Sequence, residues 1–324
     1  MKPSKFRLCL FGTSILNEYI SQNYKKNKIE YMCIITHKDD KRDLKLLNNY
    51  RLFPLKKNIK CDIYYLSKYD EKKIIKILNQ HKINFGISIG CRFIFKSRII
   101  NYFKNKLYNV HDSYLPYYKG GAPISYSIMN KEKYIGISFH EINEKIDGGK
   151  VILKKKFLIK KNIKPIDAIN KYYYHLKKDI FEFIKLKKKT KIQNSLQSTY
   201  FPRLNSEMNG FLNLNWKAEE CVSFINSFSD PYPGAHALYN GKKIIIKNAK
   251  IQSKKKYHSF LNGKIINIGK DYIRVIMGNK IVELKNLIFK NQIIKPKFFF
   301  KTGGTIFNYD AKLTKAKRAI KKYF

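Results

Sequence analysis

The sequence is poor in the residues that build disulfides, metal sites and membrane spans. Its 324 residues include five cysteines, which lie far apart without a Cys-x-x-Cys pair, and seven histidines, which form no His-Glu-x-x-His motif. No apolar run approaches the roughly 20 residues that cross a bilayer. We therefore expect reduced, buried thiols, no metal site and no membrane partner, in a soluble cytoplasmic protein.

Acidic residues are also scarce. The chain has 23 Asp and Glu against 67 Lys and Arg, which gives a formal net charge of +44. Such a charge suits nucleic acid or anionic substrates. The lysines, however, occur in short runs along the whole chain with abundant Asn and Ile, as an AT-rich coding background would produce. The charge therefore permits a polyanionic partner but supports one only weakly.

In the first half of the chain, short apolar runs alternate with helical patterns. The strand-like runs lie at 6–11, 31–35, 61–66, 84–90, 107–110 and 135–141. The helical patterns lie at 14–25, 71–81, 97–104, 123–130 and 166–186. This alternation predicts an α/β fold, in which helices cover both faces of a Rossmann-like, mostly parallel sheet. The helix over 166–186 is expected to pack on that sheet.

The pattern changes after residue 186. Lys, Gln, Ser and Thr dominate the next stretch, which predicts a linker over 187–207 between a first domain at 1–186 and a second at 208–311. Helical spacing resumes over 217–228. The short alternating runs that follow lie at 243–251, 263–267, 271–276 and 280–285. Several short strands separated by turns predict a small β-barrel, followed by a basic tail at 312–324.

The most informative stretch begins at Asn109-Val110-His111, where a predicted strand gives way to a loop. In open α/β sheets, ligands bind outside the carboxyl ends of strands. An amide, an imidazole and the carboxylate of the later Asp147-Gly148-Gly149 are the groups needed to transfer an acyl group. Taken alone, however, Asn-x-His indicates a hydrogen-bonded turn more often than an active site.

The surrounding motifs narrow this choice. They are Ser-x-Leu-Pro-x-x-x-Gly-Gly-Ala-Pro-Ile at 113–124, Gly-Ile-Ser-Phe-His at 136–140 and Ile-Asp-Gly-Gly at 146–149. Together with Asn-x-His they resemble the catalytic core of the formyltransferases that use 10-formyltetrahydrofolate. Phe11-Gly12-Thr13 resembles the first strand–helix loop of that family, while Trp216 and the motifs at 230–235 and 240–242 resemble its C-terminal domain. The resemblance implies the formyltransferase fold followed by a small OB-like β-barrel.

By position, the resemblance places the family's catalytic residues on Asn109, His111 and Asp147. A neutral imidazole can take the proton of the attacking amine, and an amide NH₂ can donate to the oxyanion. A carboxylate can orient the imidazole and stabilise its protonated form. We expect these side chains to converge within hydrogen-bonding reach, directly or through one water. Asp112 is expected to be a turn residue, and His140 to be structural.

The resemblance also implies ligand contacts. The candidates for binding the folate donor are Ile89, Gly90, Cys91, Phe93, Ser113, Leu115 and Gly148. The candidates for binding the acceptor are Gly12, Thr13, Tyr117, Lys119 and Gly120. Core, turn and packing roles are an equally consistent interpretation of the small and apolar residues among them.

The identity of the acceptor amine is the main open choice. Tyr117-Tyr118-Lys119 stands where the methionyl-tRNA formyltransferases carry Arg-Trp-Arg, and residues 37–42 lack their Pro-Asp-Arg segment and glycine-rich loop. The stretches at 198–205 and 230–235 look more like the enzymes that formylate nucleotide-linked amino sugars. We therefore predict an amino-sugar acceptor, with initiator methionyl-tRNA as the alternative.

Two further interpretations are weaker. A catalytically silent folate- or RNA-binding protein would need no aligned base, so the intact Asn109, His111 and Asp147 argue against it. Glycinamide ribonucleotide formyltransferase shares the same catalytic residues but lacks an appended barrel domain. The oligomeric state stays open, with a homodimer compatible with the sequence.

Overall fold

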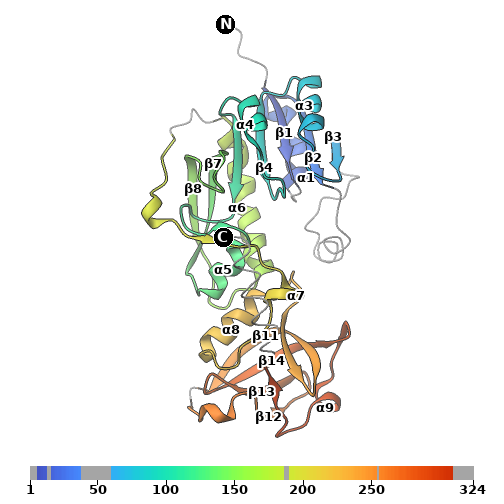
Figure 1. Ribbon diagram of the computed structural model, residues 1–324, viewed down its shortest axis with the longest axis vertical. Helices are drawn as coiled ribbons and strands as arrows, with labels where there is room; N and C mark the ends of the chain where they lie inside the picture. Colours follow the sequence, from blue (N-terminus) through green and yellow to red (C-terminus); the bar gives the residue numbers. More distant parts are fainter. Residues whose placement is uncertain (1–5, 13–15, 38–59, 186–189, 254, 309–324) are drawn as a thin grey trace. The chain divides into compact units, whose positions relative to one another are not determined.

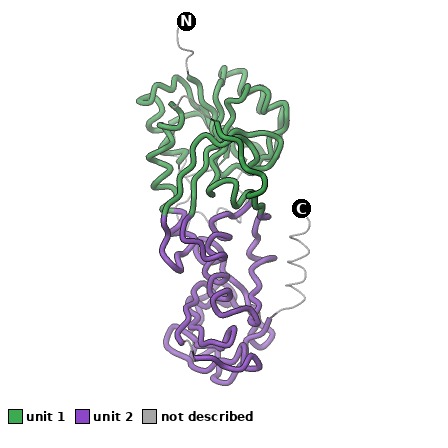
Figure 2. Tube along the Cα trace, turned by 90° about the vertical axis from the view of Figure 1, so that its left-hand side faces the viewer, with its two compact units in different colours: residues 1–120, 135–157, 170–200 green, residues 121–134, 158–169, 201–324 purple. Residues whose placement is uncertain are grey.

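The computed structural model describes residues 6–12, 16–37, 60–185, 190–253 and 255–308 (Figure 1). The chain divides into two compact units, shown in Figure 2. The first comprises residues 1–120, 135–157 and 170–200, and the second 121–134, 158–169 and 201–324. Thr13, residues 38–42 and the predicted tail at 312–324 lie outside the described residues.

Seven strands form the sheet of the first unit, in the order β3-β2-β1-β4-β5-β7-β8. They are β1 (Phe6–Phe11), β2 (Ile29–His37), β3 (Asp62–Leu66), β4 (Phe85–Ile89), β5 (Leu107–His111), β7 (Tyr134–Glu141) and β8 (Val151–Leu158). Strands β1 to β5 pair in parallel, whereas β7 is antiparallel to β5. The predicted mostly parallel sheet is confirmed. Its strand order reverses between β1 and β4, the usual position of a ligand crevice.

Amphipathic helices cover this sheet. They are α1 (Leu16–Asn23), α3 (Glu71–Gln80), α4 (Ser97–Tyr102) and α6 (Pro165–Lys185). Helix α3 begins where the Asp70 carboxylate accepts from the Lys73 amide at 3.0 Å, and it buries Ile74, Ile77 and Leu78 at helical spacing. Helix α6 packs Phe183 against Phe139 on β7, with ring centres 4.3 Å apart. This contact confirms that the helix packs on the sheet.

The second unit is built on an antiparallel sheet in the order β12-β13-β14-β11-β10-β16. Its strands are β10 (Ala235–Tyr239), β11 (Lys242–Ser253), β12 (Ile265–Ile268), β13 (Tyr272–Met277), β14 (Lys280–Phe289) and β16 (Ile306–Phe307). Next to the edge strands, the Ile265 amide donates to Gly304 and the Ile306 amide to Gly263, each at 2.9 Å. The sheet therefore curls towards a barrel, as predicted.

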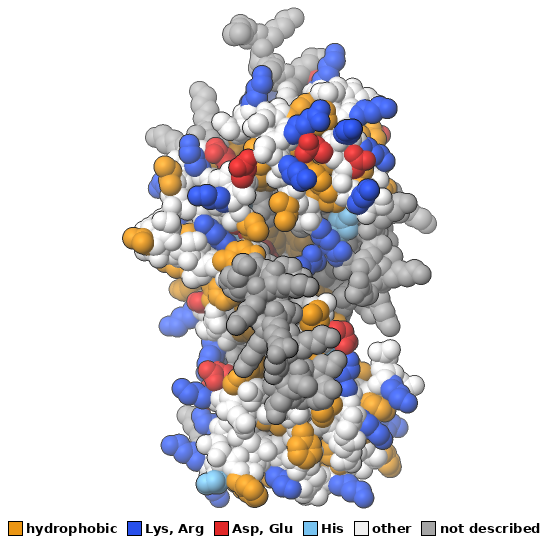
Figure 3. Space-filling view, viewed as in Figure 1, with side chains coloured by type: hydrophobic (Ala, Val, Ile, Leu, Met, Phe, Trp, Pro, Cys, Tyr) orange, Lys and Arg blue, Asp and Glu red, His pale blue; other side chains and the backbone are white. Residues whose placement is uncertain are grey.

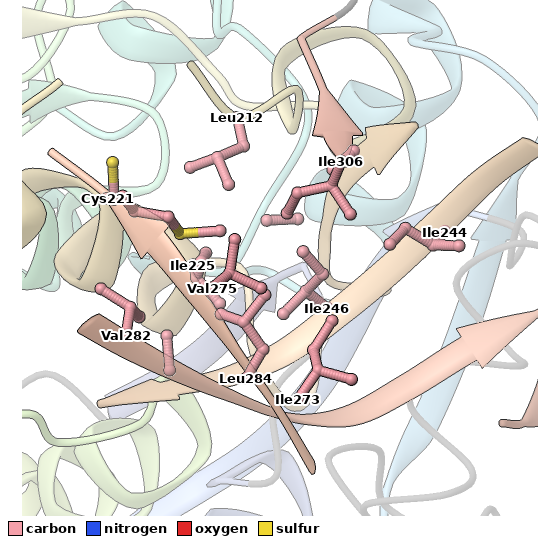
Figure 4. Packing of buried hydrophobic residues seen from close by; sticks show 14 of the residues in the cluster. Leu212, Cys221, Ile225, Ile244, Ile246, Ile273, Val275, Val282, Leu284 and Ile306 are labelled. Carbon is pink, nitrogen blue, oxygen red and sulfur yellow. The ribbon is translucent and has the colours of Figure 1, made fainter. Parts of the chain in front are cut away.

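Apolar side chains from alternating positions fill the inside of this curled sheet (Figure 4). Helix α8 (Ala218–Ser227) adds Cys221 and Ile225 to the same core, and helix α5 (Pro123–Met129) packs against α8. The shorter elements are η1 (Lys25–Asn27), β6 (Lys119–Gly120), η3 (Ser195–Gln197), β9 (Tyr200–Phe201), α7 (Ser206–Asn209), η4 (Ser259–Leu261), β15 (Gln292–Ile293) and α9 (Pro296–Phe299).

The cysteines form no disulfide bonds among the described residues. All five thiols are free, as predicted, but Cys61 and Cys91 are only half-buried. Burial raises the pKa of each of these two thiols to about 12. No described helix is long and apolar enough to cross a bilayer, and the described residues include no group of three or more His, Cys, Asp or Glu that could hold a metal. On the face in Figure 3, the described Lys and Arg side chains are dispersed and form no single patch.

Candidate active site

Three polar side chains come together at the carboxyl end of strand β5, beside the antiparallel strand β7. Asn109 and His111 are two residues apart on β5, so their side chains leave the same face of the sheet. Asn109 pairs in register with His140 on the antiparallel strand β7. The loop that follows β7 carries Asp147 back to the same place.

The Asn109 amide donates in two directions. Its Nδ2 lies 3.3 Å from Oδ1 of Asp147 and 3.2 Å from Nε2 of His140. His140 Nδ1 lies 2.8 Å from the Glu141 carbonyl oxygen, so Nδ1 carries a proton and Nε2 can accept. Both hydrogens of the Asn109 amide are therefore engaged, and the direction of the amide is fixed.

The imidazole of His111 is held from both sides. Its Nε2 lies 2.8 Å from the carbonyl oxygen of Tyr118, and its Nδ1 lies 3.6 Å from Oδ2 of Asp147. The side chain is only 6% exposed. A carboxylate at Nδ1 orients the ring and stabilises a positive charge on it. Asp147 thus lies in contact with both Asn109 and His111, and the catalytic roles of the three residues stay a prediction.

Asp147 reaches this position through an unusual backbone. Its φ of 47° is in the left-handed region, which Asp tolerates better than most residues. A side chain at Gly149 could not fit, because its Cβ would lie 1.8 Å from the carbonyl oxygen of Glu141. The Gly120 amide donates to Oδ2 of Asp147 at 2.8 Å. The Asp-Gly-Gly sequence therefore permits a turn that aims the carboxylate at His111.

Two carboxylates flank His111 Nδ1, and their surroundings shift their pKa values in opposite directions. Burial alone would raise the pKa of Asp147, but His111, His140 and the Gly120 amide outweigh burial and hold that pKa below its ordinary value. Asp112 lies 3.9 Å from Nδ1 with its side chain 36% exposed, and partial burial raises its pKa. Such a separation commonly marks different roles. Asp147 is the carboxylate suited to remain ionised beside the imidazole.

The ligand candidates lie in two groups. Gly12, Ile89, Gly90 and Cys91 come together at the switch point, where a Cβ on Gly12 would lie 2.5 Å from the Ile89 carbonyl oxygen. Half-buried Phe93 follows in the same loop. Backbone that lies this close has no room for side chains, which suits recognition of a flat ligand through backbone groups.

The second group lies beside His111. Ser113 and Leu115 are buried, and the Ser113 hydroxyl donates to the Tyr117 carbonyl at 2.7 Å, so both support the loop. Tyr117 is 40% exposed, and burial lowers the pKa of Lys119 against the raising effect of Asp147. Gly148 adjoins Asp147. Direct ligand contacts for these residues stay a prediction.

The interpretation of His140 as merely structural is incomplete, because its ring contacts two of the three predicted catalytic side chains. Two other contacts could not be predicted from the motifs: the Tyr118 carbonyl at His111 and the Gln193 side chain at the Asp147 turn. Only for His140 was there a local signal, namely a histidine on the strand that leads into the Asp147 loop.

A Rossmann-like sheet with an amide, an imidazole and an ionised carboxylate at its carboxyl edge is the arrangement of an acyl-transferring enzyme. The formyl transferase family matches residues 6–180, and the formyl transferase C-terminal domain matches residues 205–303. The chain belongs to the formyl transferase family and is a formyl-transfer enzyme.

Similar proteins extend over nearly the whole chain. The methionyl-tRNA formyltransferase of Finegoldia magna is 24% identical over 85% of this chain and 89% of its own. That of Mycoplasma genitalium is 27% identical over 87% of this chain and 91% of its own. A solved N-formyltransferase from Helicobacter canadensis has a TM-score of 0.61 and 22% identity, over 86% of this chain and 98% of its own. The solved structure supports the shared fold.

Proposed function

We propose that this enzyme transfers the formyl group of 10-formyltetrahydrofolate to the α-amino group of methionine on initiator tRNA. The observation that carries the reaction is that the Asp147 carboxylate contacts both the Asn109 amide and the ring of the buried His111. Binding alone requires no imidazole between a carboxylate and a carbonyl oxygen. The five free thiols fit a reducing cytoplasm, which belongs to the same proposal.

The chemistry is a balanced exchange of one formyl group for one proton. The amine nitrogen attacks the formyl carbon, a C–N bond forms, and the carbonyl oxygen takes up the displaced electron pair. Asn109 donates a hydrogen bond to that oxyanion. The oxyanion collapses, the bond to N10 of the folate breaks, and His111 passes the proton lost by the amine to N10.

The hydrogen bond at His111 Nε2 has to break before formyl transfer. Its Nε2 donates to the Tyr118 carbonyl and cannot accept a proton in that state. When the acceptor amine takes the place of this carbonyl, Asp147 at Nδ1 favours the tautomer with its proton on Nδ1. Nε2 then carries the lone pair that receives the amine proton. One N–H group of Asn109 likewise exchanges its present acceptor, His140 or Asp147, for a hydrogen bond to the oxyanion.

The choice of acceptor rests mainly on the relatives, and the net charge adds only weak support. The two methionyl-tRNA formyltransferases match this chain through its C-terminal domain as well as its catalytic unit. A formal net charge of +44 suits a phosphate backbone. These observations favour the acceptor that the motifs alone placed second.

A nucleotide-linked amino sugar is the second candidate. Tyr117-Tyr118-Lys119 replaces the Arg-Trp-Arg of the tRNA enzymes and lies beside His111, so the acceptor would meet aromatic rings there. The Helicobacter canadensis N-formyltransferase was solved with folinic acid and dTDP-3-aminofucose. Tyrosine rings can stack on a sugar or a base.

The deciding experiment offers both acceptors in parallel. Initiator methionyl-tRNA and a panel of nucleotide-linked amino sugars are incubated with enzyme and 10-formyltetrahydrofolate, and tetrahydrofolate release is followed. Turnover on the tRNA, with kcat/KM falling at least about tenfold between 50 and 200 mM salt, supports the proposal. Turnover on a sugar alone overturns the tRNA assignment. Folate binding without turnover on any acceptor indicates a silent binding protein and overturns the reaction itself.

A further inference from the structure

The segment at residues 190–200, here called the strap, belongs to the first unit and follows helix α6. It lies within the range predicted as a linker. At its start, Lys191 and Val151 of strand β8 exchange two backbone hydrogen bonds, of 2.7 and 2.8 Å. The strap is therefore attached to the strand that follows the Asp147 loop.

Two residues further on, the side chain of Gln193 ties down the Asp147 turn. Its Nε2 donates to the carbonyl oxygens of Asp147 at 2.8 Å and Gly149 at 2.7 Å. Two acceptors can be met only by the NH₂ group, so the orientation of this amide is settled. Its Oε1 is buried without a hydrogen-bond partner among the described residues. An unpaired buried acceptor costs free energy, and the two hydrogen bonds that Gln193 donates offset this cost.

The Asp147 carboxylate accepts from Asn109 and Gly120, but few other hydrogen bonds hold the backbone of this turn. Residues 143–146 are exposed, and Asp147 keeps its left-handed φ of 47°. Within the loop, Gly148 donates to Lys145, and outside it the Ser97 hydroxyl donates to the Glu144 carboxylate. Neither of these last two bonds involves a polar group of Asp147. Gln193 acts directly on the backbone of the residue whose carboxylate faces His111.

The other end of the strap holds the opposite side of the imidazole. The Tyr118 amide donates to Oγ1 of Thr199 at 2.8 Å, and the Lys119 amide donates to the Thr199 carbonyl at 2.9 Å. Tyr118 supplies the carbonyl at His111 Nε2, while Asp147 lies at Nδ1. One short segment thus bonds to both loops that hold the ring.

We infer that Gln193 is a positioning residue for the transfer reaction: its amide fixes the Asp147 turn so that the carboxylate is aligned with His111. The inference rests on the proposed function for its kinetic consequence and on geometry for its structural one. Without the two donated bonds, the left-handed turn relaxes and the carboxylate leaves both His111 Nδ1 and the Gly120 amide.

The test compares Gln193→Met with Gln197→Met. Both changes keep side-chain length on the same strap, but Gln197 is exposed. For Gln193→Met we expect kcat to fall about 10- to 100-fold, with KM for folate and acceptor changed less than about twofold, because a misplaced catalytic group slows the chemical step. Gln197→Met should match the wild type. An unchanged kcat, or an increase in KM alone, overturns the inference.

A second measurement does not depend on turnover. Amide hydrogen exchange at Gly120 reports on the carboxylate of Asp147, which accepts from that amide. Exchange there should become at least about tenfold faster in Gln193→Met and stay unchanged in Gln197→Met. If the wild type transfers no formyl group, the proposed function fails while this measurement still decides the role of Gln193. If Gln193→Met does not fold, Gln193→Glu replaces it, because a carboxylate has the same size and no hydrogen to donate.

Discussion

Two regions of this protein differ in what they bury. The carboxyl edge of the parallel sheet buries polar side chains, and the curled sheet of the second unit buries apolar ones. At the edge, Asn109, His111 and Asp147 are largely buried, and each has a polar partner from another part of the chain. The curled sheet encloses aliphatic side chains such as Ile244, Ile246 and Leu284 (Figure 4). Buried polar groups require matched partners, whereas apolar packing requires mainly complementary volume. The comparison separates a region built for chemistry from one built for stability.

The backbone shows the same contrast. In the β10–β11 hairpin, the left-handed positions are Asn240 and Gly241, which tolerate positive φ and make the usual two-residue turn. At the site, Tyr118 and Asp147 take φ of 58° and 47°. A tyrosine in that region is strained, and such strain persists where its surroundings hold it. Here the strap bonds to both residues.

The largest effect is expected from His111→Ala. Loss of the general base should lower kcat about 10²- to 10⁴-fold, while folate binding stays close to that of the wild type. Steady-state kinetics and a folate titration check this. Asp112→Asn is the matched control, expected within about twofold, because Asp112 is the more exposed of the two carboxylates beside the ring. If Asp112→Asn lowered kcat as much as His111→Ala, Asp112 would be the carboxylate that serves the imidazole, and the assignment of that role to Asp147 would be wrong.

Ile246→Ala should have the opposite effect, because it should lower stability and leave kcat nearly unchanged. Ile246 is fully buried in the curled sheet, so truncation should lower the free energy of unfolding by about 2–5 kcal/mol. The kcat per folded molecule should change less than about twofold. Urea unfolding and active-site titration measure the two quantities separately. A large fall in kcat at full folding would break the separation drawn between the regions.

His140 tests whether the site extends beyond the three predicted residues. In His140→Leu, Asn109 loses one of its two acceptors, and we expect kcat to fall about tenfold through the misplaced amide. His140→Gln offers an acceptor again and should recover part of that loss. Recovery would be absent if His140 only filled space.

Asp147 links the site to pH. Its pKa is depressed in the folded protein, so its carboxylate adds stability above the ordinary pKa of about 3.9, and this is lost as pH falls towards the folded value. The unfolding free energies of the wild type and Asp147→Asn should therefore differ most near neutral pH, on the order of 2 kcal/mol, and converge towards pH 3. Chemical denaturation at several pH values gives both curves. A difference that grew on acidification would show that the sign is wrong.

The smallest effect is expected at the hairpin. Asn240→Ala forces a left-handed alanine and should cost about 1 kcal/mol, whereas Asn240→Gly should be neutral or slightly stabilising. Thermal unfolding of the two variants checks this. Activity should be unchanged in both, and any loss would link the hairpin to the site.

Local pattern and motif were enough for much of this protein. Apolar runs predicted most strands of both units, because side-chain periodicity is a property of neighbouring residues, but strands β8 and β10 were not predicted. Asn109, His111 and Asp147 could be recognised because the short motifs around them resemble those of the formyltransferases. These features depend on a few consecutive residues.

The remaining contacts were decided by tertiary structure. His140 meets Asn109 because strand β7 runs antiparallel to β5 in one register, and a shift by one residue would turn the histidine to the other face. Gln193 meets Asp147 because the chain returns to strand β8 after helix α6. Composition and periodicity carry no information about which distant segments become neighbours, since that outcome depends on burying the whole sheet at once. The sequence alone therefore determined the elements and the residues able to carry out the chemistry, and folding decided which other groups hold them in place.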